Sequence, residues 1–217
     1  MRILVLLIVV LALAGCSGPD ESNGAVSADA SPVDVTGDWV EAVAAGDIAD
    51  LERLVEPIGL AVVAAVENDL RSDELAGLLV GGMPADLQTQ YWITFREDFG
   101  AIRGSSFDQI VVGREVAVPG LADFTSVEIS NDGIIGRVVL RRTDLGWQVD
   151  FAATVGPALI GPLGEYLESA LAGDHGVVIA DSYRTAVLPG LEAAIAVGDN
   201  NSVLVFETEF IRQLSEL

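Results

Sequence analysis

The stretch that decides the fold is SSFDQIVVGREVAVPGLADFTSVEISNDGIIGRVVLRRTDLGWQVDFAAT, residues 105–154. It contains four runs rich in β-branched and aromatic residues, which are separated by turn-forming residues. Asn131-Asp132-Gly133 and Asp144-Leu145-Gly146 fill two of the gaps, and such sequences favour tight hairpin turns. The stretch therefore predicts an antiparallel four-stranded meander with strands at Phe107–Val118, Phe124–Ser130, Ile134–Thr143 and Trp147–Ala152.

Side-chain alternation assigns the two faces of the last predicted strand. Successive side chains of a strand point to opposite faces of its sheet. Trp147, Val149 and Phe151 would share one face, which is the better candidate for the core. Gln148 and Asp150 would lie on the other face, so we expect Asp150 to be solvated or paired with an arginine.

The residues before this stretch have helical periodicity. Trp39, Val40 and Val43 begin an apolar stripe, which Gly46-Asp47 interrupts. Glycine tolerates the left-handed end of one helix and aspartate caps the next, so this pair predicts a helix break. The stripe resumes at Ile48, and further helices are predicted to begin at Pro57 and to cover Pro84–Phe99.

Helical periodicity returns after the meander. Leu163, Tyr166, Leu167, Ala170 and Leu171 recur at helical spacing. Gly173-Asp174 and Gly198-Asp199 repeat the break motif on either side of Val177–Val197, which Pro189 interrupts. A last helix is predicted at Ser202–Leu214. The fold class is therefore α+β, with N-terminal helices packed on a curved antiparallel meander and an added C-terminal helical segment.

The first residues predict a cellular location. Arg2 precedes an uncharged apolar run, Ile3–Ala14, which would be about 18 Å long as a helix and too short to span a bilayer. It resembles the bacterial lipoprotein signal, because Leu13, Ala14 and Gly15 precede the single cysteine, Cys16. The resemblance implies cleavage before Cys16 and attachment of a diacylglyceryl group, with palmitate-type acyl chains, through the cysteine sulfur. We expect a lipid-anchored protein on the extracytoplasmic face of the cell membrane, with membrane lipid as one partner.

The segment after Cys16 predicts a tether. Residues 17–34 are rich in Ser, Pro, Gly and Asp and contain almost no large apolar residue, so they cannot bury enough surface to fold. The expected organisation is a signal peptide at 1–15, a disordered tether at 16–34, an α+β domain at 35–155 and a C-terminal helical extension at 156–217.

Charge excludes some partners. The chain has 11 basic residues, all arginine, against 33 acidic ones, and a formal net charge of −22. Nucleic acid binding requires a basic surface, so we expect no nucleic acid partner. An acidic body would also be repelled by anionic lipid, which favours a tethered rather than a flat-lying protein.

The order of helices and strands resembles the nuclear transport factor-like fold, also called the ketosteroid isomerase-like fold. The resemblance is carried by WVEAVAAGDIADLERLV at residues 39–55 and GRVVLRRTDLGWQVDF at residues 136–151. It implies a cone in which a sheet wraps around helices and leaves an apolar mouth. Some members are enzymes with an aspartate base and tyrosine or aspartate donors. Residues 157–217 depart from that pattern, because a plain cone ends with its last strands.

Few residues are candidates for chemistry. In the cone, Asp150 would be a base with a pKa raised by burial, and Tyr91 a hydrogen-bond donor. His175 could be a base positioned by Asp174, although an exposed residue at a helix start is the simpler interpretation. Trp39, Trp92 and Trp147 could line a ligand pocket or pack in the core. Neither Asn131-Asp132-Gly133 nor residues 198–202 have the spacing of a calcium loop, so we expect no metal and no cofactor.

These observations predict a membrane-tethered cell-envelope lipoprotein whose body is a non-catalytic module that binds an envelope protein or a small apolar ligand. Two alternatives stay open. One is a cone-fold isomerase, lyase or hydrolase that uses Asp150 and Tyr91. The other is an envelope scaffold protein that acts through its C-terminal helices. The sequence leaves enzymatic activity uncertain and favours its absence.

Overall fold

The order of helices and strands follows the expected α+β class. A computed structural model describes residues 30–103, 106–131, 133–155 and 160–198. The predicted lipoprotein signal with Cys16, the residues Asp132 and Asp199, and the helix predicted at Ser202–Leu214 lie outside these described residues.

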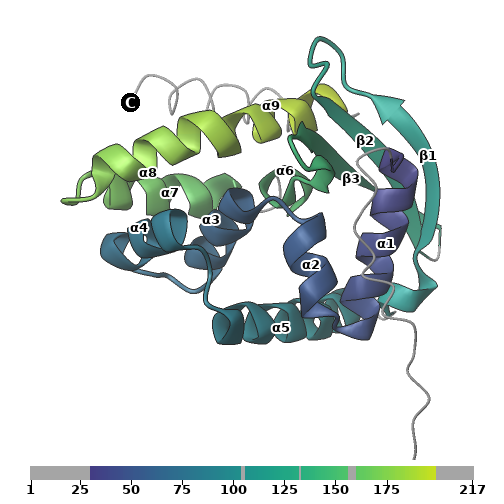
Figure 1. The fold of residues 1–217 in the computed structure, drawn as a ribbon, viewed down its shortest axis with the longest axis horizontal. Helices are drawn as coiled ribbons and strands as arrows, with labels where there is room; N and C mark the ends of the chain where they lie inside the picture. The colour runs from purple at the N-terminus through teal and green to yellow at the C-terminus, as the bar shows by residue number, and fades with distance from the viewer. Residues whose placement is uncertain (1–29, 104–105, 132, 156–159, 199–217) are drawn as a thin grey trace, which may run out of the picture.

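The four strands form the predicted antiparallel meander, in the order β1-β2-β3-β4 (Figure 1). Their bounds are β1 Val111–Ala117, β2 Phe124–Asn131, β3 Ile134–Thr143 and β4 Gly146–Val149. Phe107 lies in a short 3₁₀ turn, η1 (Phe107–Gln109), rather than in the first strand. The register of β1 against β2 is irregular between Val112 and Glu115, so this edge strand carries a bulge.

The last predicted strand is too long by three residues. It ends at Val149, and Phe151 begins helix α6 (Phe151–Val155). The backbone amide of Ala153 donates to Asp150 Oδ1 at 3.0 Å, so Asp150 caps this helix. The aspartate therefore ends the strand and starts a helix, which strand alternation alone does not indicate.

The first helix, α1 (Pro32–Ala45), begins earlier than the predicted end of the tether at residue 34. The Ser31 hydroxyl accepts from the Asp34 amide while the Asp34 carboxylate accepts from the Ser31 amide, a capping box that fixes the start of the helix. Gly46 ends α1 with φ 73°, and Asp47 caps α2 (Ile48–Leu54) through the Asp50 amide. The predicted break at Gly46-Asp47 is therefore confirmed.

Three further helices complete the N-terminal part. Their bounds are α3 Pro57–Glu67, α4 Ser72–Gly81 and α5 Ala85–Arg103. Helix α4, whose buried residues are Leu75, Ala76 and Leu78, was not predicted from the sequence. Helix α5 extends to Arg103, four residues beyond its predicted end at Phe99.

The C-terminal helices lie side by side with α3 and α4 (Figure 1). Leu163, Leu167 and Ala170 of α7 (Ile160–Leu171) are buried, as the stripe predicts. The expected helix at Val177–Val197 is a rod of α8 (Gly176–Ser182), a π-helical turn η3 (Tyr183–Val187) and α9 (Leu188–Ala196). Gly173-Asp174 does not act like Gly46-Asp47, because His175 precedes α8 and no side chain caps that helix.

Both faces of the sheet are covered near β3 and β4. Val138 and Leu140 face a core that includes α1, whereas Val139 faces a smaller cluster with Ala153 of α6 and Ala193 of α9. The larger cluster contains residues of α1, α3 and α5 as well as residues of α7 and α8. Residues 160–198 therefore share one core with the helices before the sheet.

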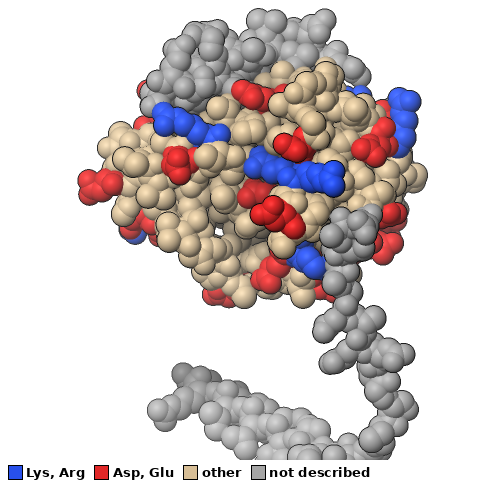
Figure 2. All heavy atoms as spheres, turned by 45° about the horizontal axis from the view of Figure 1, so that its top comes forward, with Lys and Arg blue, Asp and Glu red and all other residues tan. Residues whose placement is uncertain are grey.

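Charged side chains are dispersed over the surface. Figure 2 shows a face on which Arg, Asp and Glu side chains are interspersed with uncharged residues. None of the helices in the described parts of the chain is long and apolar enough to cross a membrane.

Candidate functional site

Asp150 is the predicted base, and the structure buries it completely. It follows β4 on the sheet face opposite Val149, as alternation predicts, but α6 and α9 cover that face. Its side chain is 0% exposed, so the expectation of a solvated carboxylate is wrong. The alternative expectation, pairing with an arginine, is confirmed by Arg141 of β3.

The Arg141–Asp150 pair joins three elements. Arg141 Nη2 lies 2.7 Å from Asp150 Oδ2, in the geometry of an ion pair rather than of an aligned hydrogen bond. The same nitrogen donates to the carbonyl of Ala186, in the π-helical turn. The guanidinium also lies 5.0 Å from the centre of the Phe124 ring. Arg141 thus connects the sheet to the rod of α8, η3 and α9.

Burial sets the proton affinity of Asp150. Desolvation raises its pKa to about 6, against a smaller lowering by Arg141 and by the Ala153 amide. The nearby carboxylate of Glu56 raises the pKa further. Glu56 is itself buried and accepts from the amides of Ile58 and Gly59, where it caps α3.

Gly190 of α9 closes the space above the carboxylate. A Cβ atom at this position would lie 2.5 Å from Asp150 Oδ2 and 2.7 Å from Oδ1. The helix backbone therefore rests directly on the carboxylate, and no substrate atom fits between them. Asp150 is poised by its pKa for proton transfer, but its position suits a structural pair and not a base in an open pocket.

Tyr91, the predicted partner of Asp150, is bound elsewhere. Its hydroxyl donates to Glu67 Oε2 at 2.8 Å, and burial, followed by the charge of Glu67, raises the pKa of the tyrosine. Burial likewise raises the pKa of Glu67. The Tyr91 ring contacts Phe151 at a centroid distance of 6.0 Å, but its hydroxyl donates its hydrogen bond to Glu67 and not to Asp150. The two residues therefore do not form one catalytic site.

His175 lies exposed at the start of α8, as the simpler interpretation predicts. No hydrogen bond links it to Asp174 in the described part of the chain. Within the described residues, no group of three or more His, Cys, Asp or Glu side chains could hold a metal ion.

The three tryptophans do not line a common pocket. Trp39 is 2% exposed and meets Phe107 edge-on at 5.9 Å. Trp92 packs against Phe151 at 5.2 Å and belongs to an aromatic cluster with Tyr91 and Phe95. Both are core residues.

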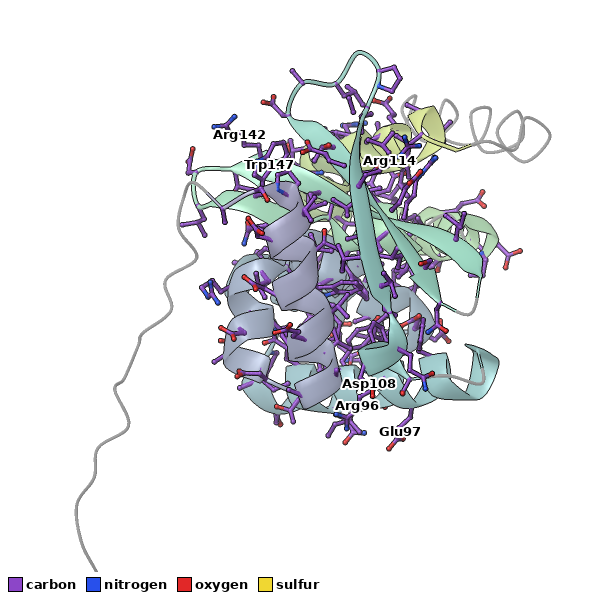
Figure 3. The ribbon with its side chains drawn as sticks, turned by 90° about the vertical axis from the view of Figure 1, so that its right-hand side faces the viewer. Arg96, Glu97, Asp108, Arg114, Arg142 and Trp147 are labelled. Carbon is purple, nitrogen blue, oxygen red and sulfur yellow. The ribbon has the colours of Figure 1, made fainter. Side chains whose placement is uncertain are left out.

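Trp147 lies apart from the other two, at the edge of the sheet, where Figure 3 shows it near Arg142. The Arg142 guanidinium is 5.8 Å from its ring centre. Trp147 is only half-buried, so its assignment to the core face holds in part.

A first surface groove lies between the α3–α4 turn and α7, with a volume of about 650 Å³. The Tyr166 hydroxyl has no hydrogen-bond partner among the described residues, and burial with the charges of Asp69 and Glu74 raises the pKa of Tyr166 to about 12. Asp69, in the same groove, has the left-handed φ of 49°. The Tyr166 hydroxyl is itself buried, so the polar groups that line this groove for a ligand are those of Asp69, Glu165 and Ser169.

A second groove, the α8 groove, has a volume of about 630 Å³ and a more apolar lining. Val177 is 84% exposed and Val178 is 39% exposed, although both are β-branched apolar residues. These two side chains form an exposed apolar pair beside the groove. The lining residues that matter here are Leu171, Val177, Val178, Ala180, Asp181 and Arg184.

Sequence reasoning missed Arg141, Glu56, Gly190 and the α8 groove. The capping role of Asp150 could have been predicted, because an aspartate before an Ala-rich run is typical of a helix N-cap. Nothing in the sequence places α9 on that aspartate, because the contact joins residues forty positions apart. Val177 was assigned to a helix, but its exposure depends on how α8 packs.

The chain matches no family model, and neither the curated proteins nor the solved structures include one with significant similarity to it. The likeness to the cone fold therefore stays a prediction.

Proposed function

We propose that the protein is a cell-envelope lipoprotein, tethered through acylated Cys16, whose folded body binds another envelope protein without catalysing a reaction. The observation that carries this proposal is the α8 groove with its exposed Val177 and Val178. An envelope protein with an apolar segment would remove these side chains from water, and each buried methylene contributes about 0.8 kcal/mol.

The position of the groove supports a tethered binding module. The first residues of α1, darkest in Figure 1, lie beside the sheet, and α8 lies at the opposite end of the molecule. A tether that precedes α1 would therefore join the folded body at the end that contains the sheet. The α8 groove would then face away from the lipid, where a second envelope protein can reach it.

The interior supports a non-catalytic role. The carboxylate of Asp150 is sealed by Arg141 and Gly190, and the Tyr91 hydroxyl is bound to Glu67. An isomerase or hydrolase that used these two residues would need to open the packing of α9 on the sheet.

Photocrosslinking tests the binding role. A photoreactive benzoylphenylalanine at Val177 should yield an adduct of defined mass in intact membranes. Ile135 is a matched control, because it is also apolar and 72% exposed but lies on β3. An adduct at both positions, or at neither, would refute docking at α8.

Replacement of the thiol tests the anchor. Cys16→Ser should abolish incorporation of labelled palmitate and move the protein from the membrane to the soluble fraction. Continued labelling and sedimentation with membranes would show that the sulfur of Cys16 is not the point of attachment.

A further inference from the structure

We propose that Arg141 and Asp150 form a pH-dependent latch: α9 is held on the sheet while Asp150 is protonated, and ionisation of Asp150 raises the fraction of molecules in which α9 opens about the π-helical turn. Such a latch would act whether or not α8 docks a partner. Three features of the described residues support it, namely an unsatisfied carboxylate, a hinge, and different supports on the two sides of that hinge.

The carboxylate of Asp150 is only partly satisfied inside the protein. Its Oδ1 accepts from the Ala153 amide, but its Oδ2 accepts no hydrogen bond among the described residues. Arg141 Nη2 lies 2.7 Å from Oδ2 without the alignment of a hydrogen bond, and Arg141 Nε is buried without a hydrogen-bond partner there. An ionised carboxylate is costly to keep in such a place, whereas a protonated one has no charge to solvate.

Asp150 has one positive and one negative neighbour. Burial has the largest effect on its pKa, Arg141 lowers it and Glu56, at the start of α3, raises it, so that the pKa of Asp150 is about 6. The attraction of the guanidinium therefore does not offset the loss of water. Ionisation would be relieved by an opening that lets water reach Oδ2.

The other titratable groups of the surrounding elements interact elsewhere or are exposed. Arg137 of β3 lies 3.8 Å from Glu128 of β2, and Glu67 of α3 accepts from Tyr91. Three more are exposed, namely Arg142 of β3, Arg184 of η3 and Glu192 of α9. Helix α6 has no titratable side chain. Burial raises the pKa of Tyr183 in η3, so this residue stays neutral in the range in which Asp150 titrates.

The π-helical turn provides the hinge. Its Ala186 carbonyl accepts from Arg141, which ties the widened turn to the sheet. Pro189, in the first turn of α9, has no amide hydrogen to donate back to the turn. Prolines and π-helical turns are the usual places at which helices bend, and here they adjoin.

The two sides of the hinge rest on different supports (Figure 1). Helix α8 packs on α4 and α7, whereas α9 packs on α6, β2 and β3. Gly190 of α9 lies directly on the carboxylate of Asp150. Asp150 caps α6, which follows it in the sequence, so this cap does not depend on α9. Opening of α9 alone would therefore admit water to Oδ2 and leave both α6 and α8 in place.

The direction of the response follows from the two states of the carboxyl group. In the open state it faces water with the ordinary pKa of 3.8, whereas in the closed state its pKa is about 6. The closed state therefore holds the proton more tightly. The open fraction should rise with pH between these two values and level off above them.

Hydrogen exchange on the full chain at several pH values tests the latch. Protection factors, which are corrected for the intrinsic effect of pH on exchange, are compared between the amides of α9, residues 191–196, and those of α8, residues 177–182. We expect the ratio of protection in α9 to protection in α8 to fall about twentyfold from pH 4.5 to pH 7.5. An unchanged ratio in the wild type would overturn the proposal, as would an equal loss of protection in both helices.

Asp150→Asn removes the titrating group, and Asp144→Asn is its matched control. Asp144 is an exposed aspartate on the turn between β3 and β4. The ratio should become independent of pH in Asp150→Asn and keep its wild-type pH dependence in Asp144→Asn. A pH dependence that survives in Asp150→Asn would assign the effect to another group and refute the latch. If Asp150→Asn does not fold, the wild-type ratio decides by itself.

Discussion

At the scale of single residues, the main polar feature of the interior is the Arg141–Asp150 ion pair, which lies between the sheet and α9. Arg141 and Asp150 are close enough to interact because β3 and β4 are neighbours, a relation that the meander predicts. Their complete burial is a property of α9, which lies on them through Gly190. Pairing of Asp150 with an arginine could thus be predicted, whereas the identity of that arginine and the burial of the pair could not.

Protonation of Asp150 should make the stability depend on pH. Its pKa is raised to about 6 by burial, against 3.8 for the ordinary carboxyl group, so the folded state holds the proton more tightly than the unfolded state. The favourable contribution is complete below pH 3.8 and is lost as the pH rises through 6. It amounts to the order of 2–3 kcal/mol.

Asp150→Asn removes this titration. Chemical denaturation at several pH values should show that the free energy of unfolding of the variant, minus that of the wild type, increases between pH 4 and pH 7. A difference that stays constant over this range would show that Asp150 has an ordinary pKa in the folded protein.

Gly190→Ala tests the contact between α9 and the carboxylate. The new Cβ would collide with both oxygens of Asp150, which Arg141 and the Ala153 amide hold in place. We expect a loss of about 1–3 kcal/mol in the free energy of unfolding.

Gly77→Ala is the matched control. Gly77 is an exposed residue within α4, and a Cβ there meets no atom within 4 Å. This variant should gain about 0.5–1 kcal/mol, because alanine favours the helix. Equal effects of the two substitutions in denaturant titrations would contradict the close contact at Gly190.

At the scale of elements, local capping signals predicted some boundaries and not others. Gly46-Asp47 was read correctly, because both the left-handed glycine and the capping aspartate are local features. Helix α4 was missed because its N-cap position is Arg71, which makes no side-chain cap. The π-helical turn was also not predicted; it precedes Pro189, and its Ala186 carbonyl accepts a hydrogen bond from Arg141.

Removal of the cap on α2 should weaken the N-terminal helices. Asp47→Ala loses the hydrogen bond from the Asp50 amide, at 3.2 Å, and should lower the free energy of unfolding by about 1 kcal/mol. Asp47→Asn keeps an acceptor at the same place and should change it by a few tenths at most. Thermal denaturation of both variants distinguishes the lost cap from a general effect of the lost charge.

At the scale of the whole molecule, the boundary expected at residues 155 and 156 does not divide the core. Val35 and Trp39 of α1 belong to the same buried cluster as Leu167, Ile179 and Leu191 from the C-terminal helices. Periodicity reveals that each helix is amphipathic but not which helix covers which face. The sequence therefore predicted the elements and the sheet order better than the packing of the helices.

A chain that ends after residue 155 should not fold by itself. It would expose the faces of α3, α4 and the sheet that α7, α8 and α9 cover. We expect near-ultraviolet circular dichroism of this fragment to lack the signals of fixed tryptophans. The full chain should unfold in one cooperative transition. A native-like spectrum of the fragment would show that the C-terminal helices are an independent unit.

The bulge in β1 affects whether neighbouring copies of the protein can pair through their edge strands. Outer strands offer free amides and carbonyls, and neighbours confined to a plane meet far more often than molecules in solution. Here the irregular register between Val112 and Glu115 interrupts that row of groups, and the exposed side chains of Arg114 and Glu115 flank the interruption. If the proposed anchor holds copies side by side, they would therefore resist pairing of their sheets into a continuous ribbon, even at high surface density.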